Sequence, residues 1–290
     1  MNMKDWIKAG EIASEVLEYG KGLIKKDKSV LEIIENVESK IFQLGGKPAF
    51  PAQISINEIA AHYAPVKEDF SIKESDIVKL DVGVHINGAI GDNAVTVGNN
   101  KELIEASREA LNEAIKIIQI GTKLKDIGKV IDKTISSYGF NPVKNLTGHS
   151  IDLYEQHSGL SIPNYDNGDN FKLEKGIVIA IEPFATTGIG MIEEGKDSGI
   201  FKLERIKSVR TQISKEILDF IADEYRTLPF TKRWLLKKFP EFKVNFALRS
   251  LEKEGMISQY KQLPEKSKGI VSQAEHTLLI DDKVKILTKR

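Results

Sequence analysis

Five side chains with metal-binding chemistry lie far apart along this 290-residue chain. They are four carboxylates and one imidazole: Asp81, Asp92, His149, Glu182 and Glu275. One divalent ion seldom requires four carboxylates, whereas two neighbouring ions need bridging carboxylates to offset their mutual repulsion. The residue types therefore indicate a site for two divalent metal ions, with metal-assisted hydrolysis as its chemistry.

The two aspartates belong to an expected β-hairpin. An Asn-Gly pair at positions 87–88 predicts a type I′ turn between two strands. With that turn, Asp81 falls opposite Ala94, and Asp92 lies two residues from Ala94. Both carboxylates therefore project from one face as diagonal neighbours, roughly 7–8 Å apart at the backbone and within reach of a shared ion. The expected strands are residues 77–86 and 93–97.

The other three candidate ligands lie in segments that read as strands or turns. His149 follows a glycine, whose missing side chain lets the backbone pass close to a crowded site. Glu182 lies in the alternating run 177–184, and Glu275 lies inside the apolar run 270–280. A glutamate buried in either strand requires a cation, and neither run contains a lysine or arginine.

Helical patterns recur along the chain with an offset of 94 residues. Expected helices over residues 7–24 and 29–44 match a second pair, and Pro48 falls on Pro142. Chance alignment of amphipathic helices is the alternative, but the shared order of helix, helix, glycine and proline argues against it. We therefore expect an α+β fold with duplicated halves about a pseudo-twofold axis, where both halves supply ligands to one site.

The composition limits both the class of protein and the kinds of metal ligand that the sequence allows. Lys plus Arg equals Asp plus Glu at 42 each, so the zero net charge argues against a general nucleic-acid binder. The chain has no cysteine, so any metal ligands are oxygen or imidazole nitrogen. Residues 1–22 lack the apolar run of a signal peptide, and no segment reaches membrane-spanning length. We therefore expect a cytoplasmic protein without membrane contact.

Residues 204–267 differ in character from their surroundings and are rich in Lys, Arg and aromatic residues. Helices are expected around residues 215–225, 233–239 and 245–254, before a short strand over 256–262. This order resembles a winged helix, a unit that binds nucleic acid in some proteins and makes only protein contacts in others. We favour the second reading and expect no sequence-specific nucleic-acid binding. The predicted division is a catalytic domain over 1–203, an inserted winged-helix-like helical subdomain over 204–267, and final catalytic strands over 268–290.

Short motifs surround each of the five candidate ligands. They are Lys-Leu-Asp81-Val-Gly, Gly-Asp92-Asn-Ala, Thr-Gly-His149-Ser, Ile-Glu182-Pro-Phe and Gln-Ala-Glu275-His-Thr. Together they resemble the motifs of the methionine aminopeptidases, which have the pita-bread metallopeptidase fold, and the resemblance covers nearly the whole chain. The insertion between Glu182 and Glu275 is similar to that of the type 2 subfamily. The sequence lacks the long basic extension of eukaryotic members, so an archaeal-style protein is expected.

The resemblance implies a role for each candidate ligand. Asp81 would chelate one metal ion, and His149 would chelate the other beside Glu182. Asp92 and Glu275 would bridge both ions. Oxygen and nitrogen ligands suit Co, Mn, Fe or Zn, so the sequence leaves the identity of the two metal ions open.

Catalytic and substrate-binding roles follow from the same resemblance. Glu182 would carry a proton from water to the leaving amine. His62 and His157 would hydrogen-bond the carbonyl oxygen of the substrate. Phe50 and Phe184 would form apolar walls around the methionine side chain. The expected reaction is removal of the N-terminal methionine from nascent polypeptides.

Two other functions of the same fold stay open. Xaa-Pro aminopeptidases and dipeptidases usually carry an additional N-terminal domain, which this sequence lacks. A non-enzymatic relative that binds RNA or ribosomes is expected to have lost metal ligands, and none is missing here. We therefore expect a monomeric methionyl aminopeptidase and leave contact with the ribosome open.

Overall fold

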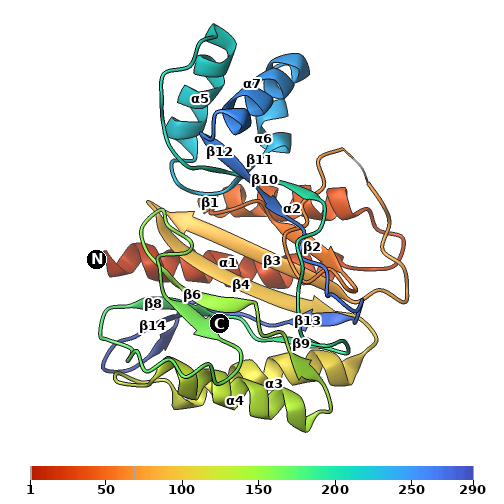
Figure 1. The fold of residues 1–290 in the computed structure, drawn as a ribbon, viewed down its shortest axis with the longest axis vertical. Coiled ribbons are helices and arrows are strands. Elements are labelled where there is room, and N and C mark those ends of the chain that lie inside the picture. The colour runs from red at the N-terminus through yellow and green to blue at the C-terminus, as the bar shows by residue number, and fades with distance from the viewer. Residues whose placement is uncertain (1, 68, 290) are drawn as a thin grey trace.

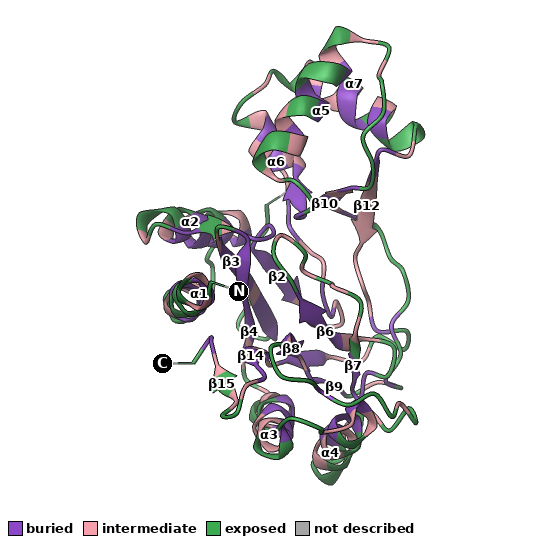
Figure 2. Ribbon diagram, turned by 90° about the vertical axis from the view of Figure 1, so that its left-hand side faces the viewer, coloured by how far each residue is buried: buried purple, intermediate pink, exposed green. Residues whose placement is uncertain are grey.

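The computed structural model describes residues 2–67 and 69–289 (Figure 1). Sheets and two helix pairs form a body, and a smaller lobe lies at one end of it, at the top of Figure 1. Buried residues concentrate in the sheets of the body, which the helix pairs flank (Figure 2). No helix in the described parts of the chain is long and apolar enough to cross a membrane.

The first helix pair is α1 (Met3–Leu23) and α2 (Val30–Gln43). The Ser29 hydroxyl caps α2 by accepting a hydrogen bond from the N–H of Glu32 at 2.9 Å. After α2, Gly45 takes a φ of 83°, a left-handed conformation that favours glycine. Both expected helices are confirmed to within a few residues at their ends.

The first sheet contains the expected hairpin. Its strands are β1 (Lys47–Pro48), β2 (Gln53–Ile56), β3 (Val78–Ile86) and β4 (Ala89–Val97). Asn87 and Gly88 both have positive φ, at 50° and 91°, as a type I′ turn requires. Asp81 pairs with Ala94, so the predicted register is confirmed. The order is β1-β3-β2, with β4 beside β3.

Helices and hairpin share one hydrophobic core. Leu80, Val82 and Val84, on the face of β3 opposite Asp81, are buried in the same cluster as Ile12 and Val37 of the two helices. Burial of each such side chain contributes about 1.5–3 kcal/mol to stability. This packing fixes the strand face that carries the aspartates.

Helix α1 crosses β4 at very close range. A Cβ atom added to Gly91 would lie 2.8 Å from the Cα atom of Gly10. Real Cβ atoms do not approach other atoms so closely, so this crossing requires glycine on the strand. The close contact sets the distance between the helix layer and the strand of Asp92.

The second half repeats the plan of the first. Helices α3 (Lys101–Ile117) and α4 (Leu124–Ser137) pack on a core of their own. The limits of α4 lie 94 residues after those of α2, and β5 (Asn141–Pro142) has the same offset from β1. Gly139 matches Gly45, with a φ of 80°. The predicted duplication is therefore confirmed.

The strands of the second half form two sheets. They are β6 (Thr147–Ile151), β7 (Ser161–Pro163), β8 (Val178–Ile181), β9 (Phe184–Thr186), β13 (Val271–Gln273), β14 (His276–Leu279) and β15 (Lys285–Ile286). The strand orders are β15-β14-β8-β6-β7 and β13-β9-β5. Strands β14 and β15 pair antiparallel at the edge of the larger sheet.

Two strands expected to be continuous are interrupted. The run 177–184 splits into β8 and β9 at Glu182 and Pro183, and the run 270–280 splits into β13 and β14 at Glu275. The breaks face each other, since β8 pairs with β14 and β9 pairs with β13. Pro183 has no N–H to donate to a ladder, which accounts for the first break. The prediction of unbroken strands was wrong, and both glutamates lie where regular pairing stops.

The lobe consists of a small sheet covered by helices. Its elements are β10 (Asp197–Leu203), α5 (Gln212–Glu224), β11 (Phe230–Thr231), α6 (Lys232–Leu236), α7 (Glu241–Lys253) and β12 (Ile257–Lys261). The sheet order is β11-β10-β12, and the lobe has its own hydrophobic core. Strand β10 precedes residue 204, so this sheet draws on residues from both sides of the expected boundary. The division into 1–203, 204–267 and 268–290 stays a prediction.

A buried ion pair joins the lobe to the body. Arg233 of α6 donates two hydrogen bonds to the Glu38 carboxylate of α2, at 2.8 and 2.6 Å. The indole of Trp234 donates a third at 2.8 Å. Glu38 is 3% exposed and Arg233 is 4% exposed, so water does not screen the pair.

Candidate metal centre

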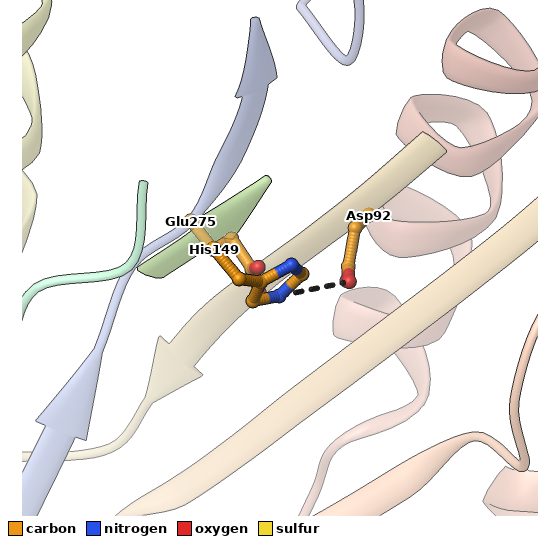
Figure 3. Close-up of side chains that lie close together, drawn as sticks. All are labelled: Asp92, His149 and Glu275. Atoms are coloured by element: carbon orange, nitrogen blue, oxygen red, sulfur yellow. Dashed lines mark ion pairs between the residues drawn. The ribbon is translucent and has the colours of Figure 1, made fainter. Parts of the chain in front are cut away.

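Three of the candidate ligands meet in the interior of the body (Figure 3). Asp92 lies on β4, His149 on β6 and Glu275 at the break between β13 and β14. One ligand atom from each lies within 4.8 Å of the others. The Nε2 atom of His149 is 3.7 Å from Asp92 Oδ2 and also 3.7 Å from Glu182 Oε1. Both halves of the fold therefore contribute to one cluster.

All five candidate ligands line one cavity of about 50 Å³. Asp81 and Asp92 reach it from the hairpin, and His149, Glu182 and Glu275 reach it from the second half. This arrangement follows from the hairpin register and from the facing strand breaks.

The carboxylates of the cluster are short of positive charge. Burial raises the pKa values of Asp81, Glu182 and Glu275 well above their usual range, and the charge of Asp92 raises them further. Burial also raises the pKa of Asp92 to about 7. His149 supplies no compensating charge, since burial lowers its pKa to about 3. A cation is what the cluster requires.

Unpartnered oxygen atoms point to the same requirement. Asp81 Oδ1 and Asp92 Oδ1 are buried and have no hydrogen-bond partner among the described residues. A buried carboxylate oxygen without a partner is strongly destabilising, and a coordinated metal ion removes that penalty. Carboxylate oxygen and imidazole nitrogen are ligands that Mn, Fe, Co and Zn accept. The residues present therefore fit a divalent metal site.

His62 lies at the same cavity in a constrained conformation. Its φ is 63°, in the left-handed region, and its N–H donates to Gln53 Oε1 at 2.7 Å. Its Nδ1 lies 3.1 Å from the carbonyl oxygen of Lys261, so Nδ1 carries the proton. Burial lowers the pKa of His62 to about 4, so the ring is neutral and Nε2 is an acceptor. The sequence led us to expect that His62 donates a hydrogen bond to a carbonyl oxygen of the substrate. In this tautomer the ring donates to the Lys261 carbonyl oxygen instead.

His157 lies beside the cluster, as expected. Its ring is 4.3 Å from the ring of His149, in an edge-on arrangement. Burial lowers the pKa of His157 to about 4, so this imidazole is also neutral near pH 7. His157 lines the carboxylate cavity and also an adjoining cavity of about 310 Å³.

The structure separates the two phenylalanines that the sequence assigned to one pocket. Phe50 lines the carboxylate cavity, whereas Phe184 lines the adjoining one. The two cavities share the side chains of His62, His157 and Glu182 in their walls. They are therefore neighbouring compartments of one site.

Comparison with known proteins identifies the family to which these motifs belong. The chain matches metallopeptidase family M24 over residues 5–217. A methionine aminopeptidase from Pyrococcus horikoshii is 46% identical over 295 residues, which cover 100% of both chains. This chain belongs to the methionine aminopeptidases of family M24. A methionine aminopeptidase from Thermococcus onnurineus is 48% identical over 280 residues and 95% of each chain.

A solved structure of the same family agrees with this fold. The crystal structure of a methionine aminopeptidase from Thermotoga maritima has a TM-score of 0.73 and 26% identity to this chain. The match covers 99% of this chain and 96% of that one. The expected pita-bread fold and the expected family are therefore confirmed, and the family is one of metallopeptidases.

Sequence reasoning missed other residues that line the site of this methionine aminopeptidase family member. Ile200, Pro229 and Tyr260 reach the carboxylate cavity from the lobe. Two glutamine side chains, Gln156 and Gln273, hydrogen-bond carboxylates of the cluster. The glutamines stand one and two residues before predicted site residues, a signal that was available. The lobe residues gave none, because only the tertiary fold brings them to the site.

Proposed function

We propose that this chain removes the N-terminal methionine from nascent polypeptides by hydrolysis assisted by two divalent metal ions. One observation carries the proposal: four carboxylates, two of them buried and two half-buried, and a neutral imidazole converge on a single cavity. Two ions rather than one are proposed because four carboxylates carry more charge than one divalent ion offsets. The substrate is proposed from a relative named methionine aminopeptidase, which matches over its whole length.

Each candidate ligand is proposed to hold a metal ion from the strand or strand break on which it lies. Asp81 would hold one ion, and His149 with Glu182 would hold the other. Asp92 and Glu275 would contact both. When bound, such ions supply positive charge that activates a water molecule and polarises the peptide carbonyl group.

Proton transfer is proposed for Glu182. Burial raises the pKa of its carboxyl group, which suits a group that accepts a proton and then returns it. The neutral His62 ring would accept a substrate N–H at Nε2, since Nδ1 is bound to the Lys261 carbonyl group. His157 is proposed to orient the carbonyl group of the substrate. These three side chains all line the carboxylate cavity.

The methionine side chain is proposed to bind against the apolar residues of the carboxylate cavity. These residues are Phe50, Ile200, Pro229 and Tyr260. The thioether of methionine is flexible and polarizable, and it packs well against aromatic rings. Phe184, in the adjoining cavity, would contact the residue that follows the methionine.

We propose a cytoplasmic monomer, because the substrate is a chain that has just left the ribosome. The lobe is proposed to act through protein contacts rather than by binding nucleic acid. Side chains of the lobe line the carboxylate cavity, and the carbonyl oxygen of Lys261 in the lobe accepts a hydrogen bond from His62. Both observations support a role of the lobe at the site. Contact with the ribosome is proposed as well, because nascent chains emerge there.

Hydrolysis of two peptides tests the proposed activity. The tripeptide Met-Ala-Ser should be cleaved after methionine, and a Xaa-Pro peptide of equal length should not. Activity should disappear with a chelator and return with Co²⁺, Mn²⁺ or Fe²⁺. A preference for Xaa-Pro would favour the alternative peptidase, and activity that survives chelation would refute the metal mechanism.

Metal content tests the proposed number of ions. Titration of the chelator-treated chain with MnCl₂, followed by calorimetry, should reach two ions per chain. The double variant Asp92→Asn/Glu275→Gln, which removes both proposed bridging charges, should lose at least one of them. A wild-type endpoint of one ion would refute the dinuclear site.

A further inference from the structure

Gln156 makes a contact for which the proposed function has no role. Its Nε2 donates a hydrogen bond to Asp92 Oδ2 at 3.2 Å, and its side chain lines the carboxylate cavity. Asp92 is 1% exposed and Gln156 is half-buried, so the bond runs from a half-buried amide to a buried carboxylate. It is a neutral donor aimed at a carboxylate that we propose as a bridging ligand.

The backbone of Asp92 is held separately. Its N–H donates to Thr277 Oγ1 at 2.8 Å, and the same hydroxyl donates to the Asp92 carbonyl oxygen at 2.8 Å. These bonds fix the main chain of Asp92, but its side chain can still rotate about χ1 and χ2. The bond from Gln156 restrains that remaining freedom.

The loop that carries Gln156 is itself anchored. The N–H of Tyr154 donates to the Gly88 carbonyl oxygen at 2.9 Å, and the Arg226 guanidinium lies 4.2 Å from the centre of the Tyr154 ring. On the other side, the N–H of Ser158 donates to the Ser150 carbonyl oxygen at 2.8 Å. Because both flanks are held, the amide of Gln156 is in place before a ligand arrives.

The hydrogen bond from Gln156 leaves the other lone-pair positions of the Asp92 carboxylate available for metal binding. An ionised carboxylate has about four lone-pair positions, and the amide of Gln156 occupies one of them on Oδ2. Asp92 Oδ1 keeps no protein partner among the described residues, and Oδ2 lies 3.7 Å from His149 Nε2. The hydrogen bond therefore restrains the carboxylate without blocking its face toward the cluster.

We propose that Gln156 is a positioning residue that holds the Asp92 carboxylate in the orientation for metal binding. It links the halves, because the loop after β6 restrains a ligand on β4. This inference rests on the proposed metal site. Groups that hydrogen-bond a metal ligand typically change metal affinity or activity by roughly 10–100-fold when they are removed.

Metal titration of the full chain tests the role of Gln156. Gln156→Leu keeps the size but removes the donor, and Gln156→Asn keeps the amide but shortens its reach by one methylene group. After chelation, both variants should bind Mn²⁺ about 10-fold more weakly than the wild type, by calorimetry with MnCl₂. At saturating Mn²⁺, KM for Met-Ala-Ser should change less than this.

A glutamine outside the cavity provides a matched control for the effect of Gln156 on Mn²⁺ affinity. Gln43→Leu removes an exposed glutamine on α2, far from the cluster in sequence and absent from its cavity, and should leave Mn²⁺ affinity unchanged. Mn²⁺ affinity within about twofold of the wild type in both Gln156 variants would overturn the proposal. So would a raised KM with unchanged metal affinity, since Gln156 would then contact substrate. Failure of the wild type to bind Mn²⁺ would instead refute the proposed metal site.

Discussion

The ion pair between Glu38 and Arg233 gives a prediction whose size follows from the structure. Arg233→Met removes a guanidinium that donates at 2.8 and 2.6 Å and leaves the Glu38 carboxylate, 3% exposed, without its counter-charge. Breaking a buried pair in this way costs about 3–5 kcal/mol of unfolding free energy. At ~2–4 °C per kcal/mol, the melting temperature should fall by roughly 6–20 °C.

Urea unfolding is the assay for this prediction. The chain has two tryptophans, and one of them, Trp234, donates to Glu38 itself. Its fluorescence reports on the joint between lobe and body, and far-ultraviolet circular dichroism reports on the whole chain. An Arg233→Met variant within about 1 kcal/mol of the wild type would show that the pair behaves like an exposed one.

A double variant separates charge from packing. Glu38→Gln/Arg233→Met removes both charges and keeps an oxygen at position 38 that can accept from Trp234. If an unpaired charge causes the loss, this variant should recover most of it, because neutral replacements of buried pairs are often well tolerated. A double variant as unstable as Arg233→Met alone would refute the electrostatic reasoning and assign the loss to a packing defect.

Three further predictions concern His62, His85 and Gly91. His62→Gln should lower kcat for Met-Ala-Ser by about 10²-fold while metal analysis shows unchanged content, and lost metal would contradict its placement outside the ligands. Burial, aided by Lys47, lowers the pKa of His85 from 6.5 to about 4. Between these two pH values the unfolded chain therefore binds more protons than the folded chain. The unfolding free energy should fall by up to about 3 kcal/mol as the pH is lowered through this window, as acid unfolding curves would show. The variant His85→Asn should not show this loss. Gly91→Ala should cost about 1–3 kcal/mol by thermal unfolding, whereas Gly22→Ala, whose Cβ meets nothing within 4 Å, should cost nothing.

Local signals in the sequence determined much of this fold. The Asn87-Gly88 pair predicted both the turn and the register that places Asp81 opposite Ala94, because a type I′ turn leaves one pairing. The 94-residue offset predicted the duplicated helices, since the same apolar spacing builds the same packing. The motifs named five candidate ligands, and all five line one cavity.

Other features depend on contacts that have no local signal. The carbonyl group of Lys261 sets the tautomer of His62, yet 199 positions separate the two residues. Glu38 and Arg233 are 195 positions apart, and nothing near either one indicates its partner. The break at Pro183 did have a signal, because a proline cannot donate to the ladder, but the alternating pattern around it favoured one strand.

The placement of the ligands across both halves has a consequence for synthesis of the chain. Asp81 and Asp92 leave the ribosome early, but the site lacks Glu275 until the whole lobe has been made. A partly made chain therefore contains the two aspartates before it contains Glu275. The five candidate ligands can therefore meet only after the residues of the lobe have been made.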